Sequence, residues 1–251
     1  LKGQKINIDN LNKKIYIYGK YTIYNPKDKI TFYGEDAEYN MDTGDLISKD
    51  IVKVVQDKKI MTGENLTYNS NTGLGDIEKN IVIINEDRSK ITGDRAKFKI
   101  NDYAEIIGNL KMITEDATLY ANRGRYIYAE KKIEIPDNIK IISKDGNITM
   151  NDGTYFISEK MIKAKNFNGI SGDRKASGNE VNYFIKRQVV QLNKDVVIEN
   201  PRMKFIGSEV EYSFLTDDIY TSKKYRIYYK NYIIYGETVS GNMKSEILNG
   251  S

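Results

Sequence analysis

A short pattern recurs along the whole chain every 28 to 30 residues. It runs apolar or aromatic, small, Gly, and then polar residues alternating with apolar ones, as in FYGEDAEY at 32–39 and ITGDRAKF at 91–98. The positions in register with this glycine are Gly34, Gly63, Gly93, Ala121, Met150, Gly178, Gly207 and Gly236. Such a period is typical of repeat proteins, in which each repeat packs against its neighbours. We therefore expect one structural unit repeated about eight times.

Each period is expected to hold two β-strands. Three and five residues after the glycine position come a small or aliphatic residue and an aromatic one, for example Ala96 and Phe98, with polar residues between them. This alternation predicts a strand with one apolar face, which we expect to begin at the glycine position. A second apolar series lies between these strands, often behind a polar pair, as in KNIVII at 79–84. Two strands per period predict roughly 16 strands joined by turns.

The composition agrees with an all-β fold. The 251 residues include 20 Tyr and only 3 Pro, while 39% of residues are apolar and 29% are charged. Aromatic and β-branched residues favour strands, and no apolar run approaches the length of a membrane-spanning helix. No linker or charge block marks a domain boundary, so we interpret residues 1–251 as a single continuous domain. The glycine- and serine-rich stretch 168–180 is the one loop-like segment, and there we expect a kink or a lengthened hairpin.

The residue types that are missing exclude most chemistry. Without Cys or His, the chain lacks thiol and imidazole nucleophiles, disulfides and the usual zinc ligands. We therefore expect no enzyme activity, no metal and no cofactor. The net charge of +4 comes from interspersed basic and acidic residues, which argues against a nucleic-acid partner. Paired carboxylates are expected to be solvated; they are Glu35 and Asp36, Glu86 and Asp87, Glu115 and Asp116, and Asp217 and Asp218.

Two architectures fit a period of about 29 residues with two strands. The first is an antiparallel stack whose bent or paired strands turn their apolar faces inward, giving a long groove. The second is a parallel β-helix, which the absence of stacked Asn ladders and of a third strand per period disfavours. In both cases the terminal strands leave unpaired edges, which must be covered or must pair with something else.

The repeated pattern in ITGDRAKFKI and in MTGENLTYNSNTGLGDIEKNIVII resembles the OstA-like domain of the lipopolysaccharide-transport proteins LptA, LptC and LptD, the last in its N-terminal periplasmic part. The resemblance covers about residues 15 to 240. It implies an antiparallel β-jellyroll in the form of a twisted V, whose apolar groove shelters the acyl chains of lipid A. It further implies a periplasmic location, lipopolysaccharide or a related lipid as ligand, and edge-to-edge strand pairing with other jellyroll transport proteins or head-to-tail with a second copy. The chain begins abruptly at LKGQKINI, so we expect that a signal or anchor segment has been removed.

The resemblance carries a groove lining over to the inward positions of the repeat. These are Ala37, Tyr39, Ile51, Leu66, Tyr68, Ile81, Ile83, Ala96, Phe98, Leu110, Met112, Tyr126, Ile139, Ile141, Tyr155, Val181, Tyr183, Val196, Ile198, Val210 and Tyr212. Among the basic residues, Arg123 and Arg125 beside Gly124 are the candidates for contact with lipid phosphates.

Two alternatives stay open at this point. The inward apolar positions would look the same in an ordinary closed core without ligand, because any two-layered β protein shows this alternation. The chain would then be a structural or adhesive β-solenoid at a cell surface, whose repeats only provide length. A tyrosine repeated on the inner face favours a groove, since its hydroxyl group needs water or a hydrogen-bond partner.

Overall fold

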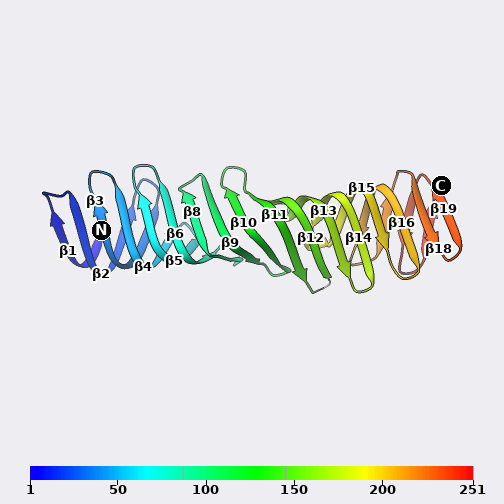
Figure 1. The fold of residues 1–251 in the computed structure, drawn as a ribbon, viewed down its shortest axis with the longest axis horizontal. Helices are drawn as coiled ribbons and strands as arrows, with labels where there is room; N and C mark the ends of the chain where they lie inside the picture. The colour runs from blue at the N-terminus through cyan, green and yellow to red at the C-terminus, as the bar shows by residue number, and fades with distance from the viewer. Residues whose placement is uncertain (87, 145, 251) are drawn as a thin grey trace. The chain divides into compact units, whose positions relative to one another are not determined.

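The computed structural model describes residues 1–86, 88–144 and 146–250, and their regular structure is almost entirely strand (Figure 1). The exception is a short 3₁₀ turn, η1 (Ile185–Arg187). The strands are β1 (Lys2–Asp9), β2 (Lys14–Asn25), β3 (Ile30–Asn40), β4 (Asp45–Gln56), β5 (Lys59–Asn69), β6 (Leu74–Ile84), β7 (Lys90–Gly93), β8 (Arg95–Lys99), β9 (Tyr103–Ile113), β10 (Ala117–Ile127), β11 (Lys132–Ser143), β12 (Gly146–Phe156), β13 (Met161–Ser171), β14 (Arg174–Phe184), β15 (Val189–Glu199), β16 (Met203–Ser213), β17 (Asp218–Thr221), β18 (Tyr225–Tyr229), β19 (Tyr232–Gly236), β20 (Val239–Asn242) and β21 (Ile247–Gly250).

Neighbouring strands pair antiparallel, as in β2 with β3, β4 with β5 and β13 with β14. The predicted all-β antiparallel class is therefore confirmed. The described part of the chain has 21 strands, and three of them arise because a strand is interrupted partway, at β7/β8, β17/β18 and β19/β20. Counted as whole strands they number 18, two more than the expected 16. The stretch 168–180 is a hairpin with a two-residue turn, and a long loop is not present there. Its residues belong to β13 and β14, which stay in register from Met161↔Phe184 to Ser171↔Arg174 across a turn at Gly172 and Asp173.

The chain divides into two compact units. The first unit contains Leu1–Glu115 and Ala121–Glu130, and the second contains Asp116–Tyr120 and Lys131–Ser251. The boundary passes through β10, whose residues belong to both units. The repeat register runs through both, and the interpretation of the chain as one continuous domain stays a proposal.

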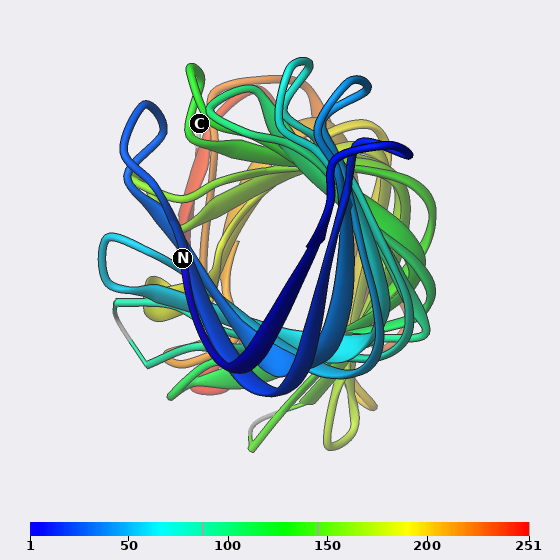
Figure 2. The same ribbon diagram turned by 90° about the vertical axis from the view of Figure 1, so that its left-hand side faces the viewer.

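The glycine position lies in the middle of a strand, and the prediction that it begins the strand was wrong. Gly34 is the fifth residue of β3 and Gly63 the fifth of β5. Two residues later the backbone takes a left-handed conformation, with φ of 50° at Asp36 and 59° at Asn65, and the strand register shifts at both places. A residue in this conformation interrupts the pleat and bends the strand, as in a β-bulge. Each bent strand therefore has two arms, as the dark-blue strands of the first unit illustrate in Figure 2.

The polar pairs of the second apolar series mark the same bend on alternate strands. Asn80 has φ 58° and Lys194 and Asp195 have φ of 59° and 52°. Asn and Asp accept this conformation at a lower cost than other residues with side chains. The polar pair in KNIVII is thus a bend in the strand, and the apolar residue behind it faces the interior.

The glycine faces a large residue on the neighbouring strand. A Cβ atom at Gly34 would lie 2.6 Å from the hydroxyl oxygen of Tyr21 and 2.8 Å from its Cζ atom. The same direct pairing recurs along the chain: Tyr21↔Gly34, Val52↔Gly63, Ile81↔Gly93, Phe167↔Gly178, Val196↔Gly207 and Tyr225↔Gly236. The paired tyrosine fills the space for a Cβ atom at Gly34 and Gly236, whereas at the other tight positions the nearest atom belongs to another residue: Ile77 at Gly63, Ile106 at Gly93 and Phe205 at Gly207. Gly178 has more room.

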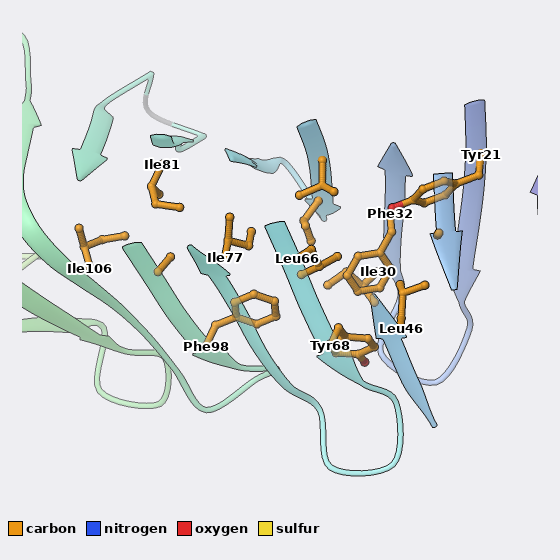
Figure 3. Packing of buried hydrophobic residues seen from close by; sticks show 14 of the residues in the cluster. Tyr21, Ile30, Phe32, Leu46, Leu66, Tyr68, Ile77, Ile81, Phe98 and Ile106 are labelled. Atoms are coloured by element: carbon orange, nitrogen blue, oxygen red, sulfur yellow. The ribbon is translucent and has the colours of Figure 1, made fainter. Parts of the chain in front are cut away.

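The interior of the first unit is a continuous apolar cluster. Its buried side chains come from β2 to β9 and converge on one space, where Phe32 and Tyr68 lie with ring centroids 4.7 Å apart and Phe98 stacks beyond them (Figure 3). Phe32 and Tyr68 belong to different arms, so the ring contact joins the arms across the interior. The second unit has its own interior, in which Phe167, Leu192 and Val196 are completely buried. Burial of each such side chain contributes about 1.5–3 kcal/mol.

Candidate functional site

The structure places nearly all of the predicted lining residues in the two interiors. Tyr39, Ile83 and Tyr126 are half-buried. The buried ones are Ala37, Leu66, Tyr68, Ile81, Ala96, Phe98, Leu110, Met112, Ile139, Ile141, Tyr155, Val181, Tyr183, Val196, Ile198, Val210 and Tyr212. Most of these side chains have almost no contact with water, so the arms close on each other and side chains fill the space between them.

Ile51 was assigned to the wrong face. Its side chain is 68% exposed, whereas Val52 is completely buried and lies opposite Gly63. A register shift between Ser48 and Ile51 adds one residue to β4 at its bend. Since side chains alternate faces along a strand, one added residue turns every later position to the other face. A repeat spacing of 30 residues from Tyr21 predicts Ile51 as the inward residue. The inward residue is Val52, one position further along the chain.

The strands run between two rows of turns, and the line where these rows meet is called the mouth of each unit. Row A contains the turns after β2, β4, β13, β15 and β18, and row B those after β3, β5, β8, β10, β16 and β20. In the first unit the Nδ2 atom of Asn25 in row A donates to the hydroxyl of Tyr68 in row B at 3.3 Å. Likewise the Nε2 atom of Gln56 donates to Oδ1 of Asn101 at 2.9 Å. The mouth of the first unit is thus bridged by neutral polar groups.

A small apolar cavity of about 60 Å³ lies beneath the mouth of the first unit. Row A contributes Ile30, Val54, Ile60, Met61 and Ile83, and row B contributes Phe98, Ile100, Ala104 and Tyr128, with Gln56, Lys59 and Lys99 as the polar residues of the lining. The cavity therefore sits between the two arms, directly above the core aromatic Phe98.

Lys59 holds the only charge at this cavity that lacks an ionic partner among the described residues. Its Nζ atom lies 4.7 Å from the ring centroids of both Tyr126 and Tyr128. It makes no ion pair or hydrogen bond with a described residue, whereas Lys99 pairs with Asp102 at 3.1 Å. Burial lowers the pKa of Lys59, and nearby Asp57 opposes this. Burial likewise raises the pKa of Tyr128 to about 12.

The mouth of the second unit is bridged by charged groups. Arg174 in row A donates from Nη1 to Oδ1 of Asp217 in row B at 2.6 Å and to the carbonyl oxygen of Phe214 at 3.1 Å. The Tyr212 hydroxyl donates to the same carboxylate oxygen at 2.8 Å. Burial and this hydrogen bond raise the pKa of Tyr212. Asp217 is 3% exposed, so the prediction that the paired carboxylates are all solvated was wrong for it.

The other described carboxylates of those pairs, among them Glu35, Asp36 and Asp218, are exposed, and Asp87 lies outside the described residues. Asp217 differs from them because its turn faces Arg174 across the mouth. This partner lies 43 residues away in the sequence, so the residues around the carboxylate pair do not predict the contact.

A larger, polar pocket of about 480 Å³ opens at the mouth of the second unit. It is lined by Arg174, Arg202 and Lys244 together with Asp173 and Asp217. Arg202 is already paired with Glu246 across the mouth, and Glu246 also accepts from the Tyr229 hydroxyl at 2.6 Å. Two of the three cations that line the pocket, Arg174 and Arg202, are thus paired with carboxylates of the chain itself.

Arg123 and Arg125, the candidates for phosphate contact, lie on the exposed face of β10, and Gly124 between them is buried. The guanidinium of Arg125 stacks 4.0 Å from the ring centroid of Tyr103. These side chains point away from the interior. Lys59 does lie at an apolar cavity. The sequence does not predict this position, because nothing in QDKK at 56–59 distinguishes Lys59 from Lys58.

Within the described residues no group of three or more His, Cys, Asp or Glu side chains is placed to hold a metal ion. No helix in this part of the chain is long and apolar enough to cross a membrane. The two mouths offer apolar volume, hydrogen-bonding groups, carboxylates and a few cations.

Comparisons with known proteins agree with the repeat pattern. The family described as OstA-like protein matches residues 3–151. No curated protein matches the chain significantly. Among solved structures, the wild-type TCP10 domain of Danio rerio CPAP, in complex with a peptide of Danio rerio STIL, is 10% identical and covers 72% of this chain and 94% of its own. Its TM-score of 0.14 is too low to support an argument about fold or function.

Proposed function

Since the chain belongs to the OstA-like protein family, we propose that it is a non-enzymatic periplasmic protein of lipopolysaccharide transport. In this proposal the acyl chains of lipid A lie between the two arms of the folded sheet, and the lipid is passed along the repeats toward the outer membrane. Family membership supports the transport context, and lipid binding by this chain is the part that needs a test.

The observation that carries the proposal is the uniform apolar lining of the arms. In the first unit, β2 to β6, β8 and β9 each contribute buried apolar side chains to one cluster, and Ile91 of β7 packs against it. Acyl chains would gain about 0.8 kcal/mol for each CH₂ group buried there. Because the lining repeats every 29 residues or so without a deep polar trap, an acyl chain could slide from one repeat to the next at little cost.

Binding requires the arms to separate, since side chains fill the interiors. The ring contact of Phe32 with Tyr68 and the hydrogen bonds of Asn25 and Gln56 hold the arms of the first unit together. A hydrogen bond of this kind contributes about 0.5–1.5 kcal/mol net. Burial of a few acyl CH₂ groups is enough to offset its loss, so we expect lipid to enter through the mouth of the first unit.

The proposal includes edge-to-edge pairing with other jellyroll transport proteins or with a second copy. In β19 four consecutive residues, Tyr232, Ile233, Ile234 and Tyr235, are exposed, so both of its faces are open. Its described pairing is with β18 alone. An exposed apolar edge strand is a template for pairing with another chain. This supports an assembly in which neighbouring domains extend the lining.

Site-specific photo-crosslinking tests the lipid site. The photoreactive amino acid p-benzoylphenylalanine replaces Phe98, which is buried between the arms, or Tyr33, which is exposed on the outer face of β3. After irradiation with lipid A, we expect crosslinked lipid from position 98 and none from position 33. Equal labelling at both positions, or none at 98 in a folded variant, would refute the proposal. The latter result would favour a surface β-solenoid without lipid ligand, the alternative from sequence.

A further inference from the structure

We propose that Lys59 and the cavity beneath it select lipids by charge: the ammonium group binds the carboxylate or phosphate of a lipid whose acyl chain enters the cavity. The inference rests on the proposed function, because it assumes that acyl chains enter between the arms. Beyond the proposed function, the inference identifies the residue at the mouth that recognises the lipid and the sign of charge that this residue prefers.

The first argument is the state of the Lys59 ammonium group. It is half-buried, and no described carboxylate or carbonyl oxygen accepts a hydrogen bond from it. A lysine ammonium has three donors, and a cation removed from water without an ionic partner costs free energy. Lys58 and Lys14 in this unit have carboxylate partners, and lysines for which no ion pair is seen among the described residues, such as Lys13 and Lys79, are exposed to water. An anion at Lys59 would supply the missing partner.

The second argument is what lies next to that charge. Gln56, Lys59 and Lys99 are the polar side chains among the residues that line the cavity, and Lys99 is paired with Asp102. A cavity with an apolar wall stays dry and accepts apolar groups. Its volume of about 60 Å³ admits only the first few carbons of a chain, so a longer chain must widen the space between the arms. One unpaired cation over an apolar opening matches an anionic amphiphile.

The third argument is how the ammonium is held. The rings of Tyr126 and Tyr128 lie 4.7 Å apart with a tilt of 57°, and each faces Lys59 at 4.7 Å. Such cation–π contacts are weaker than a charge-assisted hydrogen bond to a carboxylate or phosphate. The rings therefore keep the ammonium at the mouth and leave it able to exchange this contact for an anion.

A purely structural role would give a different result. If Lys59 only joins row A to row B by covering the two tyrosine rings, its removal will loosen the mouth and affect charged and neutral ligands alike. Charge selection predicts that only the preference for the anion is lost. The ratio of two affinities therefore separates the roles.

The test compares binding of the fluorescent fatty acid cis-parinaric acid with binding of its uncharged methyl ester. We expect the unaltered protein to bind the acid about tenfold more tightly than the ester, as one charge-assisted hydrogen bond allows. Lys59→Met should reduce this ratio to about one and keep ester binding. Lys59→Arg should retain the preference. Lys58→Met is the matched control, because Lys58 lies on the same turn, is exposed and pairs with Glu86.

The possible failures can be told apart. A folded Lys59→Met protein that keeps the tenfold preference overturns the charge selection while the lipid-carrier proposal stands. If neither probe binds the unaltered protein, the carrier proposal fails and the inference fails with it. Dodecyl phosphate and inorganic phosphate are added as competitors: competition by dodecyl phosphate alone shows that the chain is needed, and equal competition by both contradicts an amphiphile site. Should Lys59→Met not fold, Lys59→Gln replaces it.

Discussion

The mouths of the two units are bridged at the same spacing, the first by neutral groups and the second by ion pairs beside one neutral contact, from Nδ2 of Asn200 to the carbonyl oxygen of Met243 at 3.2 Å. In the first unit, Asn25 with Tyr68 and Gln56 with Asn101 are 43 and 45 residues apart, and all four side chains are neutral. In the second unit, the corresponding separations are 43 residues from Arg174 to Asp217 and 44 from Arg202 to Glu246, and these contacts are ionic.

The common separation is one and a half repeats, and it follows from the bent strand. Each strand spans half a period and connects a turn in row A to a turn in row B. The bend in the strands then brings each row-A turn against the row-B turn that lies one full period further along the chain than that connected turn. The geometry is thus fixed by the repeat, while the side chains set how firmly each mouth is closed. We expect the first unit to open more readily than the second.

Asp217→Ala is expected to give the largest effect. It leaves Arg174, which is partly buried, without its carboxylate, and the Tyr212 hydroxyl without its acceptor. Breaking one side of such a pair costs about 3 kcal/mol. Urea unfolding should show this loss, and hydrogen exchange should locate it in the second unit.

The neighbouring Asp218→Ala is the control, because Asp218 is exposed and bonds only within its own hairpins, to Thr216 and Asn242. We expect it to cost about 1 kcal/mol or less. The double variant Arg174→Met with Asp217→Leu should recover most of the stability, since apolar replacement of a buried ion pair is often neutral. A larger increase of hydrogen exchange in the first unit than in the second after Asp217→Ala would contradict the comparison.

Substitution of the repeated glycine by alanine should have different costs at Gly63, in the first unit, and at Gly178, in the second. At Gly63 a Cβ atom would lie 2.5 Å from Cγ2 of Ile77 and 2.9 Å from the carbonyl oxygen of Lys79. At Gly178 the nearest atoms are those of Leu192, at 3.3 and 3.4 Å. We expect Gly63→Ala to cost about 2 kcal/mol through overpacking and Gly178→Ala to cost less than about 0.5 kcal/mol, because lower unfolded-state entropy offsets the tighter contact. Thermal unfolding of both variants measures the difference, and similar costs would refute it.

The sequence predicted the strands well because their signal is local. The alternation around Phe98 and Tyr183 needs only a few neighbouring residues, and both side chains are buried as expected. The bend was not recognised, because an Asn or Asp such as Asn65 or Asp36 within a strand looks like any outward polar residue until its φ is known. For the same reason the extra residue in β4 passed unnoticed and Ile51 was placed on the wrong face.

The contacts across the mouths could not be predicted from the sequence, for a different reason. Gln56 and Asn101, or Arg174 and Asp217, are polar residues in turns, and such residues are usually solvated. Their pairing depends on how far each strand bends, which sets the distance between the rows of turns. Once the bend is known, polar residues that lie 43 to 45 positions apart become candidates for contacts across a mouth.

Gln56→Leu should loosen the mouth of the first unit by about 1 kcal/mol, because it removes the hydrogen bond to Asn101. We expect faster hydrogen exchange at the turns around residues 57 and 101 and faster uptake of an acyl probe. Gln191→Leu is the matched control. Gln191 donates to Glu211 on the adjacent strand at 3.0 Å, a contact between neighbouring strands that does not join the two rows of turns, so uptake should be unchanged. Equal uptake rates for the two variants would show that the Gln56 contact does not limit access.

Mild acid should give the smallest effect, a loosening of the mouth of the second unit. Hydrogen bonds from Tyr229 and from Arg202 lower the pKa of Glu246 below its ordinary value of 4.5. A carboxyl group whose pKa is lowered on folding stabilises the folded state above its unfolded pKa and loses this contribution as the pH falls through the folded value. The mouth of the second unit should therefore loosen below about pH 4.5, whereas the neutral pairs of the first unit do not titrate there. Hydrogen exchange around residues 243–246, compared with residues 66–68 beside the neutral contact of Asn25 with Tyr68, measures this difference between pH 6 and pH 3. Glu246→Gln should abolish it, and an equal response of both regions would mean that the contrast between an ionic and a neutral mouth has no energetic weight.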